Sequence, residues 1–91
     1  MSLPLPSKIG IRKIELLGFS EIRGSWERAR SIKRATAWEV WLSYAPKREC
    51  ATPANILDDW LADVITYEDA RRIAEHYAKS YACEIEQTPT A

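Results

Sequence analysis

The chain has 91 residues, of which 46% are hydrophobic and 29% are charged. This composition is typical of one folded domain and excludes an intrinsically disordered chain. No apolar run approaches the roughly 18 residues needed to cross a bilayer. The start of the chain, MSLPLPSK, carries two prolines and lacks the long apolar segment of a signal peptide. We therefore expect a cytoplasmic protein.

The formal net charge is zero, but the two halves of the sequence differ in sign. Residues 1–48 contain ten Lys or Arg and four Asp or Glu, whereas residues 49–91 contain three and nine. Either the halves neutralise each other in the fold, or the molecule has a basic pole and an acidic pole. Two such poles would suit a charged partner or a second copy of the chain.

Few residues are suited to catalysis or to metal binding. Cys50 and Cys83 do not form a CxxC pair, and His76 is the single histidine, which excludes a standard Cys/His zinc site. Three glycines provide no Gly-rich phosphate loop, and the aspartates within 58–63 lack the calcium-loop pattern. We expect no cofactor, no metal and no enzymatic activity.

The first half of the chain predicts a strand followed by a helix. Residues 1–8 are expected to form a flexible tail, because Pro4 and Pro6 remove backbone donors. Residues 11–17 alternate as in a strand, with Ile14 and Leu16 on one face and Lys13, Glu15 and Leu17 on the other. The spacing of Trp26, Ala29, Ile32 and Ala35 behind a Ser25 N-cap predicts an amphipathic helix over 26–35. Its outer face would carry the cations Arg28, Arg30, Lys33 and Arg34.

The middle of the chain predicts a strand and then leaves two alternatives. Residues 37–44 alternate clearly, with Trp38, Val40, Leu42 and Tyr44 on one face and Glu39, Trp41 and Ser43 on the other. After them, residues 53–63 have helical spacing behind a Thr52–Pro53 start. In the favoured alternative, residues 59–65 form a strand instead. Its inward side chains would be Trp60, Ala62 and Val64, and its outward side chains would be Leu61 and Asp63.

The last part of the chain predicts a helix and a strand. Thr66 is a good N-cap, and apolar residues recur at helical spacing up to Tyr81. Residues 82–86 follow as a strand, with Cys83 directed inward. We expect one domain over 9–87, followed by a short C-terminal tail at 88–91.

These elements in order predict an α+β domain with the ferredoxin-like arrangement β-α-β-β-α-β, in which both helices cover one face of an antiparallel sheet. If residues 53–63 are helical, the order becomes β-α-β-α-α-β. In its general look the chain resembles small accessory proteins of phages and other mobile elements, without a motif that assigns it to a family.

In the ferredoxin-like arrangement the uncovered sheet face suits contact with another protein. Several carboxylates there would repel the phosphates of RNA, whereas an exposed Trp is typical of a protein interface. The leading hypothesis is a small non-catalytic binding protein that pairs with itself, as a homodimer, or covers a partner. The predicted interface residues are Trp41, Leu17, Leu61, Glu39, Glu15, Glu84 and Glu86.

Two alternative functions remain open. The basic segment 26–35 could bind nucleic-acid phosphates through Arg28, Arg30, Lys33 and Arg34, although the near-neutral sequence pI of about 6.6 is unlike that of dedicated nucleic-acid binders. A small-molecule regulatory domain would instead need a pocket near Trp38, Trp60 or Tyr77. No membrane contact is expected.

Overall fold

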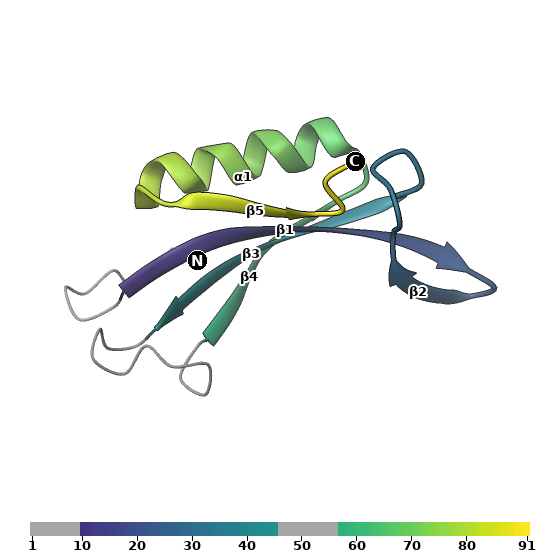
Figure 1. Cartoon of the computed structure of the whole chain (residues 1–91), viewed down its shortest axis with the longest axis horizontal. Coiled ribbons are helices and arrows are strands. Elements are labelled where there is room, and N and C mark those ends of the chain that lie inside the picture. Colours follow the sequence, from purple (N-terminus) through teal and green to yellow (C-terminus); the bar gives the residue numbers. More distant parts are fainter. Residues whose placement is uncertain (1–9, 46–56) are drawn as a thin grey trace.

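The computed structural model describes residues 10–45 and 57–91, which form a five-stranded sheet with one helix on one of its faces (Figure 1). The tail predicted at 1–8 and the segment 46–56, with Cys50, lie outside the described residues. The elements in chain order are β1 (Gly10–Ile22), β2 (Ser25–Arg28), β3 (Ala37–Ala45), β4 (Leu57–Val64), α1 (Tyr67–Tyr81) and β5 (Glu84–Thr88).

Strand β1 is the centre of the sheet. Strand β3 pairs antiparallel along one of its edges, and β4 pairs antiparallel with β3 to form the outer edge. The other edge of β1 carries two short strands end to end. Residues 13–17 of β1 pair in parallel with β5, and residues 19–22 pair antiparallel with β2. The β1–β2 hairpin therefore extends beyond the part of the sheet that α1 covers (Figure 1).

Helix α1 begins and ends close to the predicted positions. The Thr66 hydroxyl accepts a hydrogen bond of 3.2 Å from the backbone N–H of Asp69, which caps the first turn. At the other end, Ala82 adopts a left-handed conformation with φ 53°. Gln87 of β5 accepts hydrogen bonds from the Tyr67 hydroxyl and from Arg71. These contacts attach α1 to the strand that follows it.

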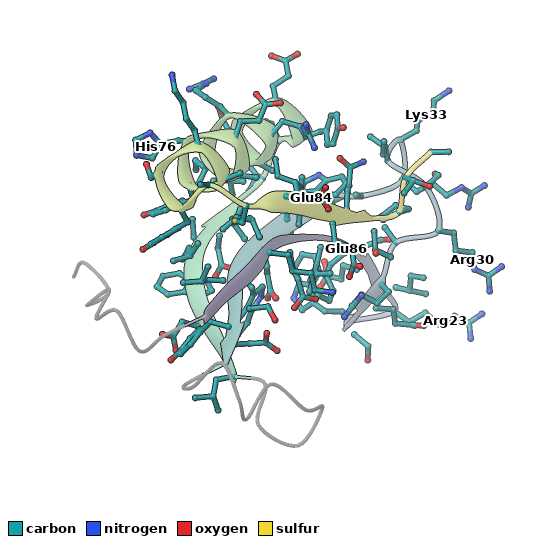
Figure 2. All side chains as sticks on the ribbon, turned by 60° about the vertical axis from the view of Figure 1, so that its left-hand side comes forward. Arg23, Arg30, Lys33, His76, Glu84 and Glu86 are labelled. Carbon is teal, nitrogen blue, oxygen red and sulfur yellow. The ribbon has the colours of Figure 1, made fainter. Side chains whose placement is uncertain are left out.

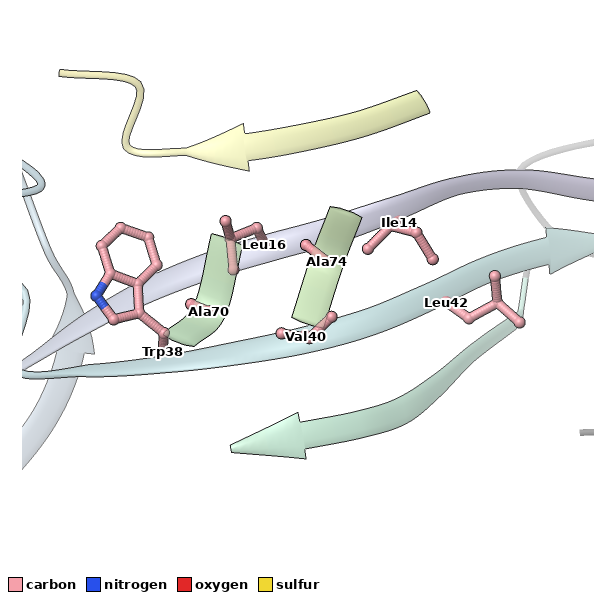
Figure 3. Close-up of a cluster of buried hydrophobic side chains, with 7 residues drawn as sticks. All are labelled: Ile14, Leu16, Trp38, Val40, Leu42, Ala70 and Ala74. Atoms are coloured by element: carbon pink, nitrogen blue, oxygen red, sulfur yellow. The ribbon is translucent and has the colours of Figure 1, made fainter. Parts of the chain in front are cut away.

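The core lies between α1 and the sheet face beneath it (Figure 3). Two small residues on the helix, Ala70 and Ala74, are fully buried and let the helix approach the sheet closely. The sheet side of the core consists of Ile14, Leu16, Trp38, Val40 and Leu42. These are the inward residues that alternation predicts for the first and second strands. Gly18 makes room for Trp38, because a Cβ there would lie 2.9 Å from the indole ring.

The predicted helix over 26–35 is wrong. Residues 25–28 form β2, which a two-residue turn joins to β1, and residues 29–36 form a loop of turns. Arg23 and Gly24 both have positive φ, at 53° and 82°, as the tightest hairpin turns require. Helical spacing nevertheless predicts which loop side chains point inward. Ala29 is buried, and Ile32 and Ala35 pack against the core.

The loss of this helix changes the topology, so the ferredoxin-like arrangement is not confirmed. With one helix among the described residues, β3 returns directly beside β1 and no other strand lies between them. In the last part of the chain, α1 links β4 to β5, and both strands run in the direction of β1. The α+β class is therefore confirmed. The first two long strands, β1 and β3, are antiparallel neighbours, whereas the predicted arrangement joins them through a helix.

The alternative with a helix over 53–63 is wrong for its described part, since residues 57–64 form β4. The favoured strand is confirmed, but its register contains a β-bulge. Val40 pairs with Ala62, whereas Trp41 pairs with Trp60, so Leu61 is the extra residue. Ala62 and Val64 face the core as predicted. Trp60 and Leu61 have the reverse of their predicted orientations.

Candidate functional site

The sheet face opposite α1, which we call the open face, is left uncovered by the described elements (Figure 1). It mixes aromatic side chains with carboxylates. The register places on it Lys13, Glu15, Leu17 and Phe19 from β1, Trp26 and Arg28 from β2, Glu39 and Trp41 from β3, Asp58, Trp60 and Asp63 from β4, and Glu84 and Glu86 from β5.

Six of the predicted interface residues lie on the open face. They are Trp41, Leu17, Glu39, Glu15, Glu84 and Glu86. Leu61 does not lie there, because the bulge turns its side chain toward the core, where it is partly buried. Trp60 takes its place on the open face, directly opposite Trp41 on the neighbouring strand.

Three aromatic residues of the open face were not predicted to lie there. Phe19 continues the alternation of Glu15 and Leu17. It was missed because the first strand was predicted to end at residue 17, whereas β1 continues to Ile22. Trp26 was assigned to the inner side of a helix, but on β2 its side chain is 58% exposed. Trp60 depends on the bulge, for which the sequence gives no clear signal.

Two of the three tryptophan side chains of the open face donate hydrogen bonds to carboxylates of their own strands. The indole N–H of Trp41 donates to Glu39 at 2.9 Å, and that of Trp60 donates to Asp63 at 2.8 Å. Trp60 is still 56% exposed. These hydrogen bonds satisfy the polar atoms of the two indoles and leave ring surface available for contact.

The open face contains two hollows that differ in polarity. An apolar hollow of about 420 Å³ lies near the hairpin and is lined by Phe19, Trp26, Ala37, Trp38, Glu39, Asp63, Val64 and Ile65. Ile65 is 78% exposed. A more polar hollow of about 340 Å³ is lined by Glu15, Leu17, Phe19, Arg28, Glu39, Trp41 and Asp58. Of the residues proposed for a small-molecule pocket, Trp38 lines the first hollow, whereas Trp60 and Tyr77 line neither.

A pair of carboxyl groups lies across β3, with Glu15 on the central strand β1 and Asp58 on the outer strand β4. Glu15 is hydrogen-bonded to Asp58, and burial, followed by the charge of Asp58, raises the pKa of Glu15 above its ordinary value of 4.5. Lys13 opposes this rise, but its ammonium group also binds Glu86 at 2.7 Å. This end of the open face is acidic, whereas Arg28 stacks over Phe19 toward the hairpin, with its guanidinium carbon 5.4 Å from the ring centre.

The four predicted phosphate contacts lie close together in the chain but not on a helix. Arg28 ends β2, and Arg30, Lys33 and Arg34 occupy the loop 29–36. Figure 2 shows Arg23, Arg30 and Lys33 at one end of the molecule, with His76 at the other. A hollow of about 390 Å³ lies among Ser20, Ile22, Glu27, Arg28, Arg30 and Arg34.

Within residues 10–45 and 57–91, no group of three or more His, Cys, Asp or Glu side chains is arranged to hold a metal ion. Burial raises the pKa of the Cys83 thiol, so this cysteine stays protonated at neutral pH and is a poor nucleophile. In the same part of the chain, α1 is too short and too polar to span a membrane.

Comparisons with known proteins give no match. No protein-family model fits the chain, and no curated protein and no solved structure is significantly similar to it. Its surfaces are therefore the basis on which a function can be inferred.

Proposed function

We propose that this chain is a non-catalytic binding protein that pairs with a second copy of itself through the open face. The observation that carries the proposal is the group of four aromatic side chains, Phe19, Trp26, Trp41 and Trp60, on a face that no described element covers. Large aromatic residues dominate the binding energy of protein interfaces, and contiguous exposed apolar patches mark such interfaces.

Charge favours one arrangement of the two copies. The open face is acidic at the end with Glu15, Asp58, Glu84 and Glu86, and it carries Arg28 toward the hairpin. A two-fold axis near Trp41 would place the hairpin end of each copy over the acidic end of the other. The same surface then serves both copies, and Arg28 of each copy meets carboxylates at the acidic end of the other. A net charge of zero does not oppose this association.

The test is sedimentation of the wild type and of Trp60→Glu over a range of protein concentrations. The wild type should form a dimer whose fraction increases with concentration and decreases with salt. Trp60→Glu should weaken the dimer at least about thirtyfold, which is the effect of losing an interface residue worth about 2 kcal/mol. Trp60 is exposed, so this variant is expected to fold. Trp41→Glu provides a second disruption closer to the centre.

Leu57→Glu is the matched control. Leu57 is 45% exposed and lies on the same strand as Trp60, but it pairs with Tyr44 and so belongs to the opposite face of the sheet. This variant should dimerise like the wild type. A wild type that stays monomeric at every concentration would refute self-pairing, as would a dimer that resists both Trp→Glu changes.

A further inference from the structure

A set of four cations lies at the end of β2 and in the loop that follows it. We call this set, Arg28, Arg30, Lys33 and Arg34, the basic platform. The loop that carries three of them is fixed to the sheet at both ends. The backbone N–H of Ala29 donates to Gly18 at 2.9 Å, and that of Thr36 donates to Phe19 at 2.8 Å. Between these points, Ile32 donates to the carbonyl of Ala91 at 2.8 Å.

The side chains of the loop are sorted into an inner and an outer set. Ala29 is 6% exposed, and Ile32 and Ala35 pack against the core. The cations therefore project from the outer side, and Arg30, Lys33 and Arg34 are all exposed. A loop whose backbone is already ordered loses little conformational entropy when it binds a ligand.

Ion pairs among the described residues do not neutralise the three loop cations of the platform, whereas Arg28 also borders the hollow that Glu15, Glu39 and Asp58 line. Among the described residues, Arg30, Lys33 and Arg34 form no ion pair, and Arg28 interacts with the ring of Phe19. Arg23 at the hairpin turn adds a further exposed cation at this end (Figure 2). The hollow of about 390 Å³ lined by Arg28, Arg30 and Arg34 contains one carboxylate, that of Glu27. Such a surface is suited to an anion that spans several cations.

We infer that the basic platform binds the phosphate backbone of a nucleic-acid duplex. Several phosphates at regular spacing match several fixed cations, and contacts to phosphates set position without reading sequence. Single strands are usually held by stacking on aromatic rings within a basic groove. Here the aromatic rings lie among the carboxylates of the open face, and Arg28 covers Phe19. A duplex, whose phosphates lie outside, fits this platform better.

The test is fluorescence anisotropy with a labelled DNA duplex, an RNA duplex and single-stranded DNA, each titrated at several salt concentrations. If all four cations contact phosphates of the DNA duplex, the logarithm of affinity should fall with the logarithm of salt with a slope of about −3 to −4. The double variant Arg30→Ala/Arg34→Ala should reduce the size of that slope by about 2. Tighter binding to either duplex than to the single strand supports the inference, and the tighter duplex identifies the nucleic acid.

The control variant is Arg72→Ala/Lys79→Ala, which removes two exposed cations from α1 and leaves the platform intact. It should keep the wild-type slope. The inference is overturned if neither duplex binds at low salt, if the single strand binds most tightly, or if the control loses as much as the platform variant. Circular dichroism of each variant establishes that it is folded. The platform and control variants both keep Arg28, the cation that also lies on the open face, so the comparison between them does not depend on whether the chain dimerises.

Discussion

At the scale of single residues, Glu15 and Asp58 bring two carboxyl groups of the open face together, and a hydrogen bond between them is one cause of the raised pKa of Glu15. Two carboxyl groups can form this bond only when one of them is protonated. Burial of Glu15 and the nearby negative charge of Asp58 both favour its protonated form, and Glu86 adds a smaller effect in the same direction. The folded state therefore holds a proton that the unfolded chain releases at lower pH.

We predict that Glu15→Gln removes a pH dependence of stability. The pKa of Glu15 is raised in the folded state. Its contribution to the free energy of unfolding is therefore favourable below about pH 4.5 and declines as the pH increases through the raised pKa. Glutamine keeps a donor for Asp58 but cannot ionise. The free energy of unfolding of the wild type, relative to that of Glu15→Gln, should therefore decrease between about pH 4 and pH 7.

Urea unfolding at both pH values checks this prediction, with Glu84→Gln as the control. Glu84→Gln removes one exposed carboxylate from the same face and therefore controls for the loss of a single negative charge. A constant difference between the wild type and Glu15→Gln would mean that the two carboxyl groups do not share a proton.

At the scale of elements, the β-bulge in β4 decides which residue of the Trp60–Leu61 pair faces the protein interior. Strict alternation would bury Trp60 and expose Leu61. Because Leu61 is an extra residue in β4, Trp41 pairs with Trp60, and Trp60 lies on the open face. The alternation of side chains along the neighbouring strand β3 is not interrupted. The bulge and three aspartates on this outer strand also discourage pairing with a further strand, which favours the face over the edge as a contact surface.

We predict that Leu61→Ala destabilises the monomer more than Trp60→Ala, although Trp is the larger side chain. Leu61 packs against the core, and its truncation should cost roughly 1–3 kcal/mol. Trp60 is mostly exposed, so its truncation should change the free energy of unfolding by about 0.5 kcal/mol or less. Urea unfolding at dilute protein concentration makes the comparison. The opposite order would show that the bulge does not form.

Segment 25–36 shows at the same scale how one pattern can be satisfied by two structures. Apolar residues at 29, 32 and 35 suit a helix, but a loop of successive turns also directs them to one side. The turn at Arg23–Gly24 places residues 25–28 beside β1, where they pair as a strand and cannot form the first turn of a helix. The Arg-Gly turn was the local signal for this hairpin, because the glycine tolerates positive φ without strain.

At the scale of the whole molecule, the two proposed contacts use different surfaces. The aromatic residues lie on the open face, whereas Arg30, Lys33 and Arg34 belong to a loop at the hairpin end of the molecule (Figure 2). Arg28 is the one residue shared by both, since it lines hollows on each surface. The basic platform comes from the first half of the sequence, and the second half supplies much of the acidic charge.

We predict that the two surfaces can be inactivated separately. Trp60→Glu should weaken dimerisation and retain the duplex salt slope per protomer, because it leaves all four cations in place. Arg30→Ala/Arg34→Ala should lose duplex affinity and still dimerise. Sedimentation and anisotropy on both variants test this separation. Loss of both activities in either variant would indicate a single composite surface.

Local patterns in the sequence are enough to predict the α+β class, helix α1 with its Thr66 cap, the inward residues of β1 and β3, and six residues of the open face. Each of these follows from periodicity or capping within one element, which depends on local geometry. The folded structure is needed to show that residues 25–28 pair with β1, that β3 lies beside β1, and that Trp60 faces outward. These features depend on strand partners distant in the sequence, and a one-residue bulge that reverses side-chain orientation leaves the local pattern almost unchanged.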